Sequence, residues 1–182
     1  MDPNFELRGQ RVRLRPMRPA DITPQHVGWL NDPEVVRYSN QRFVRHTRYT
    51  SRSYLGRFEG SGDVYLSVRL LESDRPIGTL TAHRQLHHGT ADIGILMGER
   101  AVWGQGLGGE AFQLLADWLA VQPGMRKITC GTLSVNHGML KVAQRAGFER
   151  EAVRVAQELV DGVPADIVLF ARFTPDAPPG LV

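Results

Sequence analysis

Alternation of hydrophobic and polar residues marks most of the strands that this chain is expected to form. A period of two residues is typical of a strand with one buried face. Bounded by turn residues, this pattern predicts strands at 11–16, 63–71, 76–86, 91–98, 127–133, 152–160 and 165–173. The residues "DGVP" between the last two segments predict a tight hairpin. Gly94, inside the fourth segment, is a candidate for a bulge or for the close approach of a ligand.

Helical spacing and capping residues predict two well-defined helices in the second half. Hydrophobic residues recur every three or four positions in 110–121, which follows a glycine-rich stretch. The segment 136–148 begins with Asn136 as a candidate N-cap and ends at Gly147, which favours a left-handed stop. Both helices follow predicted strands, so this half has the order strand, helix, strand, helix and hairpin.

The first half is expected to contain two more helices. Asp21 is the expected cap of a helix that ends near Pro33, and Thr47 is the expected cap of a helix over 48–58. The intervening segment 35–43 is predicted to be a loop or a further short helix. Together these elements predict an α+β fold with a mixed central sheet of about seven strands and about four helices.

Length and composition are those of an ordinary globular protein. We expect one domain over 1–174 and a disordered tail over 175–182. Hydrophobic residues make up 42% of the chain and charged residues 23%, with no apolar run long enough to span a membrane and no signal peptide. The single cysteine, Cys130, excludes an internal disulfide, lies in a predicted buried strand and is interpreted as structural. A cytoplasmic location is therefore expected.

Charge is unevenly distributed along the chain. Residues 1–57 carry 11 arginines, no lysine and five acidic residues, a net charge of +6, whereas 58–182 carry 11 basic and 14 acidic residues, a net charge of −3. A basic first third can bind anions. The alternative is that arginine is simply the preferred surface residue of this chain, and the sequence leaves both open.

The stretch "WGQGLGGEA" (103–111) has the composition of a phosphate-binding loop before a helix. Glu and Ala follow its last glycine, whereas a P-loop requires Lys and Ser or Thr. It also matches the dinucleotide pattern G-x-G-x-x-G, but no acidic residue lies between Asp117 and Glu149 to bind a ribose. The third interpretation is a cradle for the pyrophosphate of coenzyme A, held by backbone N–H groups at the helix start. Gly106 and Gly108 would allow close approach of the backbone.

Three ordered motifs resemble the GNAT acetyltransferase superfamily, in particular the branch that includes the ribosomal-protein acetyltransferases RimJ and RimL. "GWLNDPEVVRY" (28–38) is similar to its first-helix segment, "ADIGILMGERAVWGQGLGGEA" (91–111) to its acetyl-CoA motif, and "SVNHGMLKVAQRAGF" (134–148) to its Asn-x-x-Ser…Gly-Phe motif. The match is spread over nearly the whole chain. It implies the GNAT fold, splayed at the central strands, and direct transfer of an acetyl group from acetyl-CoA to a primary amine without a metal.

The resemblance also implies which residues bind acetyl-CoA. Backbone groups of the strand 91–98 would hold the pantetheine arm and the developing oxyanion, with the strand distortion at Gly94. Asn136 would hydrogen-bond the pantetheine arm. The predicted cofactor-binding residues are Ile95, Leu96, Met97, Trp103, Gly104, Gln105, Gly106, Leu107, Gly108, Gly109, Asn136 and Met139.

The chain departs from the family pattern at three positions. Trp103 stands where the superfamily often has Gln or Arg, so the contact with the pyrophosphate must rest on the backbone. The Ser of the third motif is Met139. The Tyr that many members use as general acid would fall near Ala143 and is absent.

The attacking amine must be neutral, which makes the base a central question. Deprotonating a lysine-like amine at neutral pH costs roughly 4–5 kcal/mol, and an α-amine about 1.4 kcal/mol. Asp92 is the first candidate base and His83 the second, although each could be an ordinary strand residue. Glu110 is interpreted as a first-turn residue that complements the helix dipole. His83, His87 and His88 lack a neighbouring Cys or acidic cluster, so no metal site is predicted.

The acceptor is expected to bind near the arginine segment, which we define as residues 37–48 ("RYSNQRFVRHTR"). Guanidinium groups bind phosphates and aromatic rings stack on bases, which suits a nucleotide-linked amino sugar. The segment is also similar to amino-sugar acetyltransferases of surface-polysaccharide pathways. An N-terminal α-amine of a ribosomal protein is the alternative, and a cationic polyamine or antibiotic is less favoured. The predicted substrate residues are Trp29, Arg37, Tyr38, Asn40 and Arg42.

A non-catalytic CoA-binding module remains a second class of function, because Met139, Ala143 and the unassigned base permit it. The expected partner is a small-molecule or peptide amine, with no direct nucleic-acid or membrane partner. The last hairpin, 153–173, could pair across a homodimer.

Overall fold

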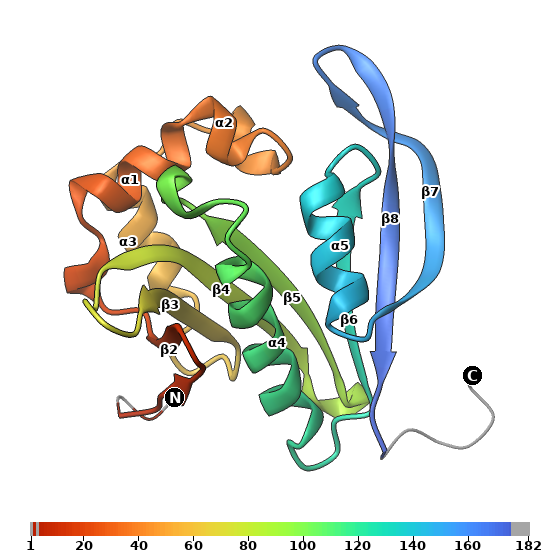
Figure 1. Ribbon diagram of the computed structural model, residues 1–182, viewed down its shortest axis with the longest axis horizontal. Helices are drawn as coiled ribbons and strands as arrows, with labels where there is room; N and C mark the ends of the chain where they lie inside the picture. The colour runs from red at the N-terminus through yellow and green to blue at the C-terminus, as the bar shows by residue number, and fades with distance from the viewer. Residues whose placement is uncertain (1, 3, 176–182) are drawn as a thin grey trace.

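The computed structural model, which describes residues 2 and 4–175, contains an eight-stranded mixed sheet (Figure 1). The strand order is β1-β2-β3-β4-β5-β6-β8-β7, and β5–β6 is the parallel pair among otherwise antiparallel neighbours. The strands are β1 (Leu7–Arg8), β2 (Val12–Pro16), β3 (Val64–Leu70), β4 (Pro76–Gln85), β5 (Thr90–Met97), β6 (Lys127–Leu133), β7 (Glu149–Val160) and β8 (Val163–Phe173). The predicted disordered tail covers residues 175–182, and 176–182 lie outside the described residues.

In the described part of the chain, five α-helices and four short 3-10 helices connect the strands. The α-helices are α1 (Pro24–Asn31), α2 (Pro33–Val36), α3 (Arg48–Gly56), α4 (Leu107–Ala120) and α5 (His137–Arg145). The 3-10 helices are η1 (Pro19–Asp21), η2 (Asn40–Phe43), η3 (Leu86–His88) and η4 (Arg100–Val102). The mixed α+β fold is therefore confirmed. The prediction was about seven strands and about four helices, and the structure has one more strand and one more α-helix.

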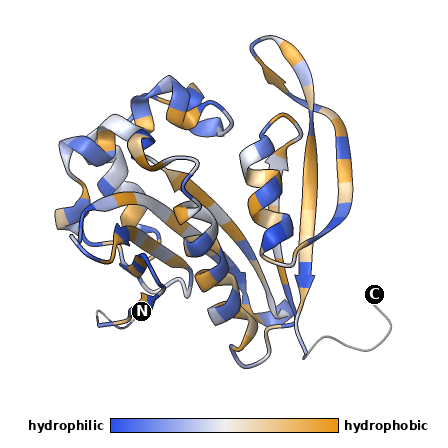
Figure 2. Ribbon diagram, viewed as in Figure 1, coloured by the Kyte–Doolittle hydropathy of each residue, from blue (hydrophilic) through white to orange (hydrophobic). Residues whose placement is uncertain are grey.

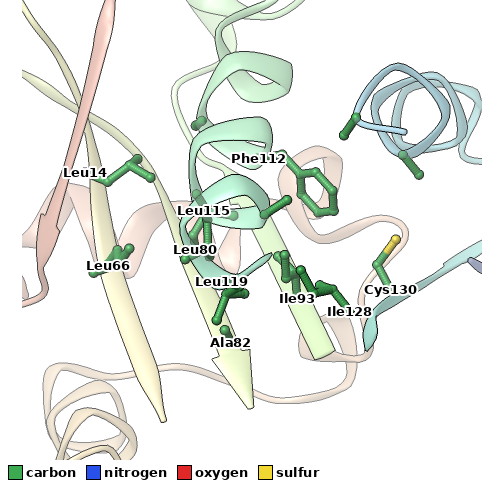
Figure 3. Packing of buried hydrophobic residues seen from close by; sticks show 14 of the residues in the cluster. Leu14, Leu66, Leu80, Ala82, Ile93, Phe112, Leu115, Leu119, Ile128 and Cys130 are labelled. Atoms are coloured by element: carbon green, nitrogen blue, oxygen red, sulfur yellow. The ribbon is translucent and has the colours of Figure 1, made fainter. Parts of the chain in front are cut away.

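Helix α4 covers the main hydrophobic core. Its residues Phe112, Leu115 and Leu119 are fully buried and lie over β3, β4 and β5 (Figure 3). Burying each such side chain contributes about 1.5–3 kcal/mol. The strand side of this core includes Leu14, Leu66, Leu80, Ala82, Ile93, Ile128 and Cys130. Cys130 is 1% exposed, and burial raises the pKa of its thiol to about 12, so the thiol is a packing group.

A smaller core lies on the opposite face of the sheet. It contains Met17, Ile22, Leu55 and Tyr65, and it packs α3 against β3. Successive strand residues point to opposite faces, so Leu66 serves the first core while Tyr65 serves the second. Hydrophobic residues are spread over many elements (Figure 2). Among the described residues, no helix combines the length and hydrophobicity needed to cross a bilayer.

The two halves of the sheet are joined by only three residue pairs. Strand β5 pairs with β6 from Thr90 to Asp92, and the partners are Lys127 to Thr129. Beyond Asp92 the strands separate (Figure 1), so residues 93–97 pair with β4 alone and residues 130–133 with β8 alone. We call this unpaired region the wedge. It is the splay that the family resemblance implies.

The distortion that separates the strands does not lie at Gly94, and that prediction is wrong. Pairing of β4 with β5 runs without a register shift through the Thr81–Gly94 pair. A Cβ on Gly94 would lie 2.9 Å from the Thr81 hydroxyl, so the glycine accommodates a close cross-strand contact. The separation begins two residues earlier, after Asp92, whereas β6 stays paired with β8 along its whole length.

The expected cap of the first helix is also wrong. Thr23, not Asp21, caps α1, and its side chain accepts a hydrogen bond from the His26 backbone N–H. Asp21 instead accepts two hydrogen bonds of 2.7 Å from the Arg15 guanidinium, and Arg69 lies 3.4 Å from the same carboxylate. The strong ion pair therefore outcompetes the capping role.

Many of the arginines in the basic first third lie in ion pairs. Arg15 binds Asp21, and Arg13 lies 3.0 Å from Glu6 and 2.5 Å from Asp74. These contacts favour the interpretation that arginine is the preferred surface residue over this part of the sheet.

Candidate functional site

The glycine loop leads into α4 without a side-chain cap. Gly106 is the N-cap residue in the left-handed region, with φ of 81°. The first hydrogen bond of the helix runs from the Glu110 N–H to the Gly106 carbonyl. Within the described chain, the N–H groups of residues 107–109 have no acceptor, as expected for a first helical turn. These N–H groups and the helix dipole form an environment that fits a pyrophosphate.

The glycine loop also has a cationic neighbour that sequence reasoning missed. The Arg11 guanidinium donates to the Gln105 carbonyl at 3.0 Å and to Glu110 Oε2 at 3.2 Å. A Cβ on Gly106 would lie 3.4 Å from Arg11 Nη2, so this nitrogen lies directly beside the loop. Arg11 thus supplies a positive charge close to the loop in which Trp103 replaces the usual Gln or Arg. No local pattern identifies it, because 94 residues separate it from Gln105.

Glu110 holds the start of α4 against β2. Its carboxylate accepts hydrogen bonds from the backbone N–H groups of Arg11 at 2.8 Å and Val12 at 3.2 Å. Burial acts to raise the pKa of Glu110, but these hydrogen bonds outweigh it and hold the pKa below its usual value. The carboxylate is therefore ionised and engaged, which fits the interpretation of Glu110 as a first-turn residue.

Trp103 connects the glycine loop to the end of β5. Its indole N–H donates to the Met97 carbonyl at 2.9 Å, and the Arg100 guanidinium lies 5.8 Å from its ring. Gln105 donates to the Ala101 carbonyl at 3.0 Å, which folds the loop back on itself. The two predicted loop side chains thus fix the loop backbone.

The strand edges of the wedge contain the backbone groups that are predicted to contact pantetheine. Along β5, residues 93–97 have no partner on the β6 side, so alternate N–H and C=O groups are free to pair with a ligand. The Met97 carbonyl is already used by Trp103, which leaves the backbone of Ile95 and Leu96 as the main candidates. A Cβ on Gly108 would lie 3.0 Å from Met97 Cγ, so the helix start packs tightly against this strand.

Asn136 caps α5, as predicted. Its Oδ1 accepts from the Met139 N–H at 3.2 Å, and its Nδ2 donates to Thr132 Oγ1 at 3.1 Å. Both polar atoms of the side chain therefore have a partner within the chain. The predicted contacts of Asn136 and Met139 with the cofactor stay predictions. Ala143, at the position where many relatives have Tyr, is fully buried.

Asp92 lies at the vertex of the wedge. It is the last β5 residue paired with β6, and its Oδ2 accepts a hydrogen bond of 2.7 Å from the Thr129 hydroxyl. Burial raises the pKa of Asp92, partly offset by the Thr129 hydrogen bond and by the charge of His83. A carboxyl group with a raised pKa at a strand junction is a candidate for proton transfer.

On the sheet face beside Asp92, a glycine lies on each side of the wedge. Strand alternation places Gly94 on the face of Asp92, and Gly131 on the face of Thr129. A Cβ on Gly94 would meet only Thr81 within 4 Å, and one on Gly131 only residues of β8. Nothing from across the wedge approaches either glycine, which leaves room for a substrate next to the Asp92 carboxylate.

His83 is paired with Asp92 across β4 and β5. Its Nδ1 lies 2.9 Å from Asp63 Oδ2, an interaction that the sequence did not indicate. The structure therefore brings both predicted base candidates together. His87 and His88 lie in η3, and no group of three metal-ligating side chains occurs in the described part of the chain.

The arginine segment contacts the tip of the β7–β8 hairpin, which the turn residues Asp161 and Gly162 close with positive φ, as predicted. Three hydrogen bonds join them: Arg37 to Asp161 Oδ2 (3.2 Å), Asn40 to Glu158 Oε1 (3.2 Å) and Arg42 to the Leu159 carbonyl (3.0 Å). The segment and hairpin come from opposite halves of the sheet (Figure 1). Three of the predicted substrate residues thus contact the hairpin, and any contact with an acceptor stays a proposal.

A groove of about 420 Å³ lies between the arginine segment and the hairpin tip. Arg37, Arg42 and Arg45 line it together with apolar side chains such as Val36 and Val160. Arg42 Nη1 is buried and has no hydrogen-bond partner among the described residues. Such a nitrogen has an unmet need for an acceptor.

The other two predicted substrate residues are placed differently. Trp29 is 8% exposed, and its ring occupies the space over Gly98, so it packs α1 against the end of β5. Tyr38 is half-buried, with the Arg37 guanidinium 5.6 Å from its ring centroid. The position of Trp29 favours a packing role.

Comparison with known proteins agrees with this geometry. Residues 11–149 match the family described as "Acetyltransferase (GNAT) domain", and the chain belongs to this family of acetyltransferases. The Bacillus subtilis (strain 168) protein described as "Probable N-acetyltransferase YjcK" is 24% identical over 178 residues, covering 93% of this chain and 98% of that protein.

Two solved structures have similar folds. RimL, a ribosomal L7/L12 alpha-N-protein acetyltransferase in complex with coenzyme A, has a TM-score of 0.82 at 16% identity, covering 96% of this chain and all of that one. The microcin C7 self-immunity acetyltransferase MccE, in complex with acetyl-CoA and AMP, has a TM-score of 0.76 at 15% identity, covering 91% and 93%. The protein is thus an N-acetyltransferase with the GNAT fold.

Proposed function

We propose that this enzyme transfers the acetyl group of acetyl-CoA directly to a primary amine of a small molecule, with Asp92 as the base. The observation that carries the proposal is the Asp92 carboxyl group at the vertex of the wedge, beside Gly94 and Gly131. Its raised pKa brings it closer to neutrality, where a base accepts a proton most effectively. The Thr129 hydroxyl fixes the orientation of the carboxylate.

The cofactor would be held by the residues that the wedge and glycine loop present. Acetyl-CoA supplies the thioester that the amine attacks. The free N–H groups of residues 107–109 and the Arg11 guanidinium would bind its pyrophosphate. The free edge of β5 at Ile95 and Leu96 would pair with the pantetheine arm and orient the carbonyl oxygen.

Positioning supplies much of the rate enhancement in this proposal. Holding two reactants in a productive geometry contributes roughly 7–11 kcal/mol. The chain therefore needs no covalent intermediate. The remaining requirement is removal of one proton from the amine, which falls to Asp92.

The groove favours an acceptor with an anionic group, and a nucleotide-linked amino sugar carries one. Its volume is in the range of small-molecule sites, roughly 300–1,000 Å³. Arg42 Nη1 offers a buried donor without a partner, and guanidinium groups bind phosphate oxygens in pairs. MccE, which has a similar fold, was solved in complex with AMP, so a protein of this fold has been found with a nucleotide bound.

The test is release of the CoA thiol from acetyl-CoA with two acceptors, a nucleotide-linked amino sugar and an N-terminal ribosomal-type peptide. We expect turnover with the sugar, and Arg42→Met should raise its KM while kcat stays within twofold. Turnover with the peptide alone would replace the proposed acceptor by a protein α-amine. Binding of CoA without turnover of any amine would leave a non-catalytic module.

A substitution at Asp92 tests its assignment as the base. Asp92→Asn should lower kcat by about 10²- to 10⁴-fold, the usual contribution of a positioned base. Asp117→Asn, on the outer face of α4 where the carboxylate binds Gln113 and Arg172, is the matched control and should keep wild-type activity. Full activity of Asp92→Asn across the pH range would exclude Asp92 as the base.

A further inference from the structure

His83 is held by a carboxylate that no predicted role accounts for. Asp63, in the turn before β3, places Oδ2 2.9 Å from His83 Nδ1. Its other oxygen accepts the backbone N–H of Arg84 at 2.8 Å, so the carboxylate is fixed at both ends. Burial acts to raise the pKa of Asp63, but the His83 and Arg84 hydrogen bonds hold it below its usual value. Asp63 therefore stays ionised at neutral pH.

The Asp63 carboxylate selects one tautomer of the imidazole. An ionised carboxylate accepts hydrogen bonds only, so Nδ1 must carry the proton and donate. Nε2 then has a free lone pair and is the basic nitrogen. The ring is also restrained by Phe58, whose centroid lies 5.6 Å away at an interplanar angle of 33°. The side chain of His83 is 53% exposed, so the basic nitrogen has access to solvent.

His83 lies next to the proposed base. The two residues are directly paired between β4 and β5, and side chains of such pairs share one sheet face about 5 Å apart at Cβ. The charge of His83 also acts on Asp92, because it lowers the pKa of that carboxyl group and partly offsets the effect of burial. A row of polar groups thus runs across four elements, from Asp63 through His83 and Asp92 to Thr129.

We propose that His83, oriented by Asp63, carries the reaction proton from Asp92 to solvent. The substrate ammonium gives one proton to the Asp92 carboxylate, and the nitrogen keeps the electron pair with which it attacks the thioester carbonyl. The new C–N bond replaces the C–S bond, and the second proton lost by the nitrogen leaves with the CoA thiolate, which departs as the thiol. Asp92 passes this proton to His83 Nε2, which forms an imidazolium stabilised by Asp63. The imidazolium then releases the proton to water or buffer, and both side chains return to their starting states. Asp63 acts as a positioning residue. This inference rests on the proposed function, in which Asp92 is the base.

The surroundings of His83 favour a relay over a purely structural pair. A hydrogen bond between a carboxylate and an imidazole this exposed contributes little to stability. The charged groups around the ring are Asp63, Asp92 and the neighbouring Arg84, whose guanidinium is bound to the Gly62 carbonyl. The α3 side contributes the uncharged ring of Phe58.

Two tyrosines lie on the far side of Phe58 and remain neutral. The centroids of Tyr54 and Tyr65 lie 5.2 and 5.0 Å from that of Phe58, and burial raises the pKa of both hydroxyls. They therefore add no charge near His83 in the pH range of the reaction.

The first test is the tautomer of His83 in the protein without ligands, read from its ¹⁵N chemical shifts. We expect Nδ1–H in the wild type and Nε2–H in Asp63→Asn, because the amide NH₂ donates to Nδ1 while its oxygen retains the Arg84 contact. Asp117→Asn should leave the tautomer unchanged. Wild-type protein in the Nε2–H form, or Asp63→Asn in the Nδ1–H form, would overturn the positioning role.

The second test compares turnover, with wild-type thiol release as the reference for the proposed function itself. We expect Asp63→Asn and His83→Gln each to lower kcat by about tenfold or more. Both should keep the KM for acetyl-CoA within twofold. Added imidazole should restore part of the activity of His83→Ala. Variants that keep the wild-type kcat from pH 6 to 9, or lose activity through KM alone, would refute the relay even though the enzyme is active. Absence of wild-type turnover with every amine would instead refute the proposed function.

Discussion

Glu110 in the first turn of α4 accepts hydrogen bonds from both the backbone N–H and the guanidinium of Arg11, at 2.8 and 3.2 Å. The contact joins residues 99 positions apart and connects the start of β2 to the glycine loop. It sets the position of the helix end that we propose binds pyrophosphate. The cofactor site is therefore stabilised by a part of the sheet that does not itself form the wedge.

Removal of this contact should weaken binding of CoA. In Glu110→Ala, two backbone N–H groups and the Arg11 guanidinium lose an ionised acceptor, which costs about 1–3 kcal/mol. We expect the Kd for CoA, measured by calorimetry, to rise about tenfold. Gln113→Ala, on the exposed side of the same helix, is the control and should bind CoA normally. An unchanged Kd for Glu110→Ala would show that the helix start is positioned without this carboxylate.

Gly106→Ala should also weaken binding of CoA. Its φ of 81° is unfavourable for alanine by about 1–2 kcal/mol, and a Cβ there points toward Arg11. We expect lower stability in urea unfolding and a higher Kd. Gly28→Ala, in α1 with no atom within 4 Å of the added Cβ, should instead be stabilising by about 0.5–1 kcal/mol. Equal effects of the two substitutions would contradict the role of the left-handed turn.

The Arg15–Asp21 ion pair should contribute stability that disappears in acid. Burial acts to raise the pKa of Asp21, but the hydrogen bonds from Arg15 and Arg18 outweigh it, and the pKa lies below the ordinary 3.8. The contribution is therefore complete above pH 3.8 and is lost as the pH falls through the lower folded-state value.

Asp21→Asn should cost about 3–5 kcal/mol in urea unfolding at pH 7, because it leaves a largely buried guanidinium without its partner. The difference from the wild type should shrink in strong acid, where both carry a neutral side chain. The exposed Glu59→Gln is a control that should unfold as the wild type does. A destabilisation below 1 kcal/mol at pH 7 would be inconsistent with a stabilising buried pair.

His26 should make stability depend on pH between about 4 and 6.5, a less acidic range than that of Asp21. It is 2% exposed, its Nδ1 has no partner in the described chain, and burial lowers its pKa from 6.5 to about 4. The unfolded chain therefore binds a proton between pH 6.5 and 4 that the folded chain does not, so stability falls by about 3 kcal/mol over this range. His26→Phe, which keeps an aromatic ring beside Trp29, should flatten this part of the profile. A profile with the same slope in both proteins would assign the effect to other groups.

Local patterns in the sequence predicted much of the fold. The strand 127–133 coincides with β6, Thr47 and Asn136 are the N-caps of their helices, and the left-handed Gly147 follows α5. These features depend on neighbouring residues, so the sequence carries them directly. Strand β1 was missed because two residues are too few to show a period.

The candidate site was harder to predict, because its key contacts link distant parts of the chain. Arg11 and Asp63 became relevant only when the sheet placed them beside the glycine loop and His83. The Asp21 prediction failed because a nearby arginine competes with the helix N-terminus for the carboxylate, and Arg69 joins it from β3. The capping ability of Asp21 is a local property, whereas its partner Arg15 is determined by how β2 packs against η1.

The small number of residue pairs between β5 and β6 also affects how readily proteases degrade the protein. Segments held by few contacts open more often than the rest of a fold, and such openings are where proteases cut. A ligand that pairs with the free strand edges suppresses this opening, by about 2.7 kcal/mol when its concentration is a hundredfold above its Kd. Supply of acetyl-CoA would then govern the lifetime of this enzyme as well as its turnover.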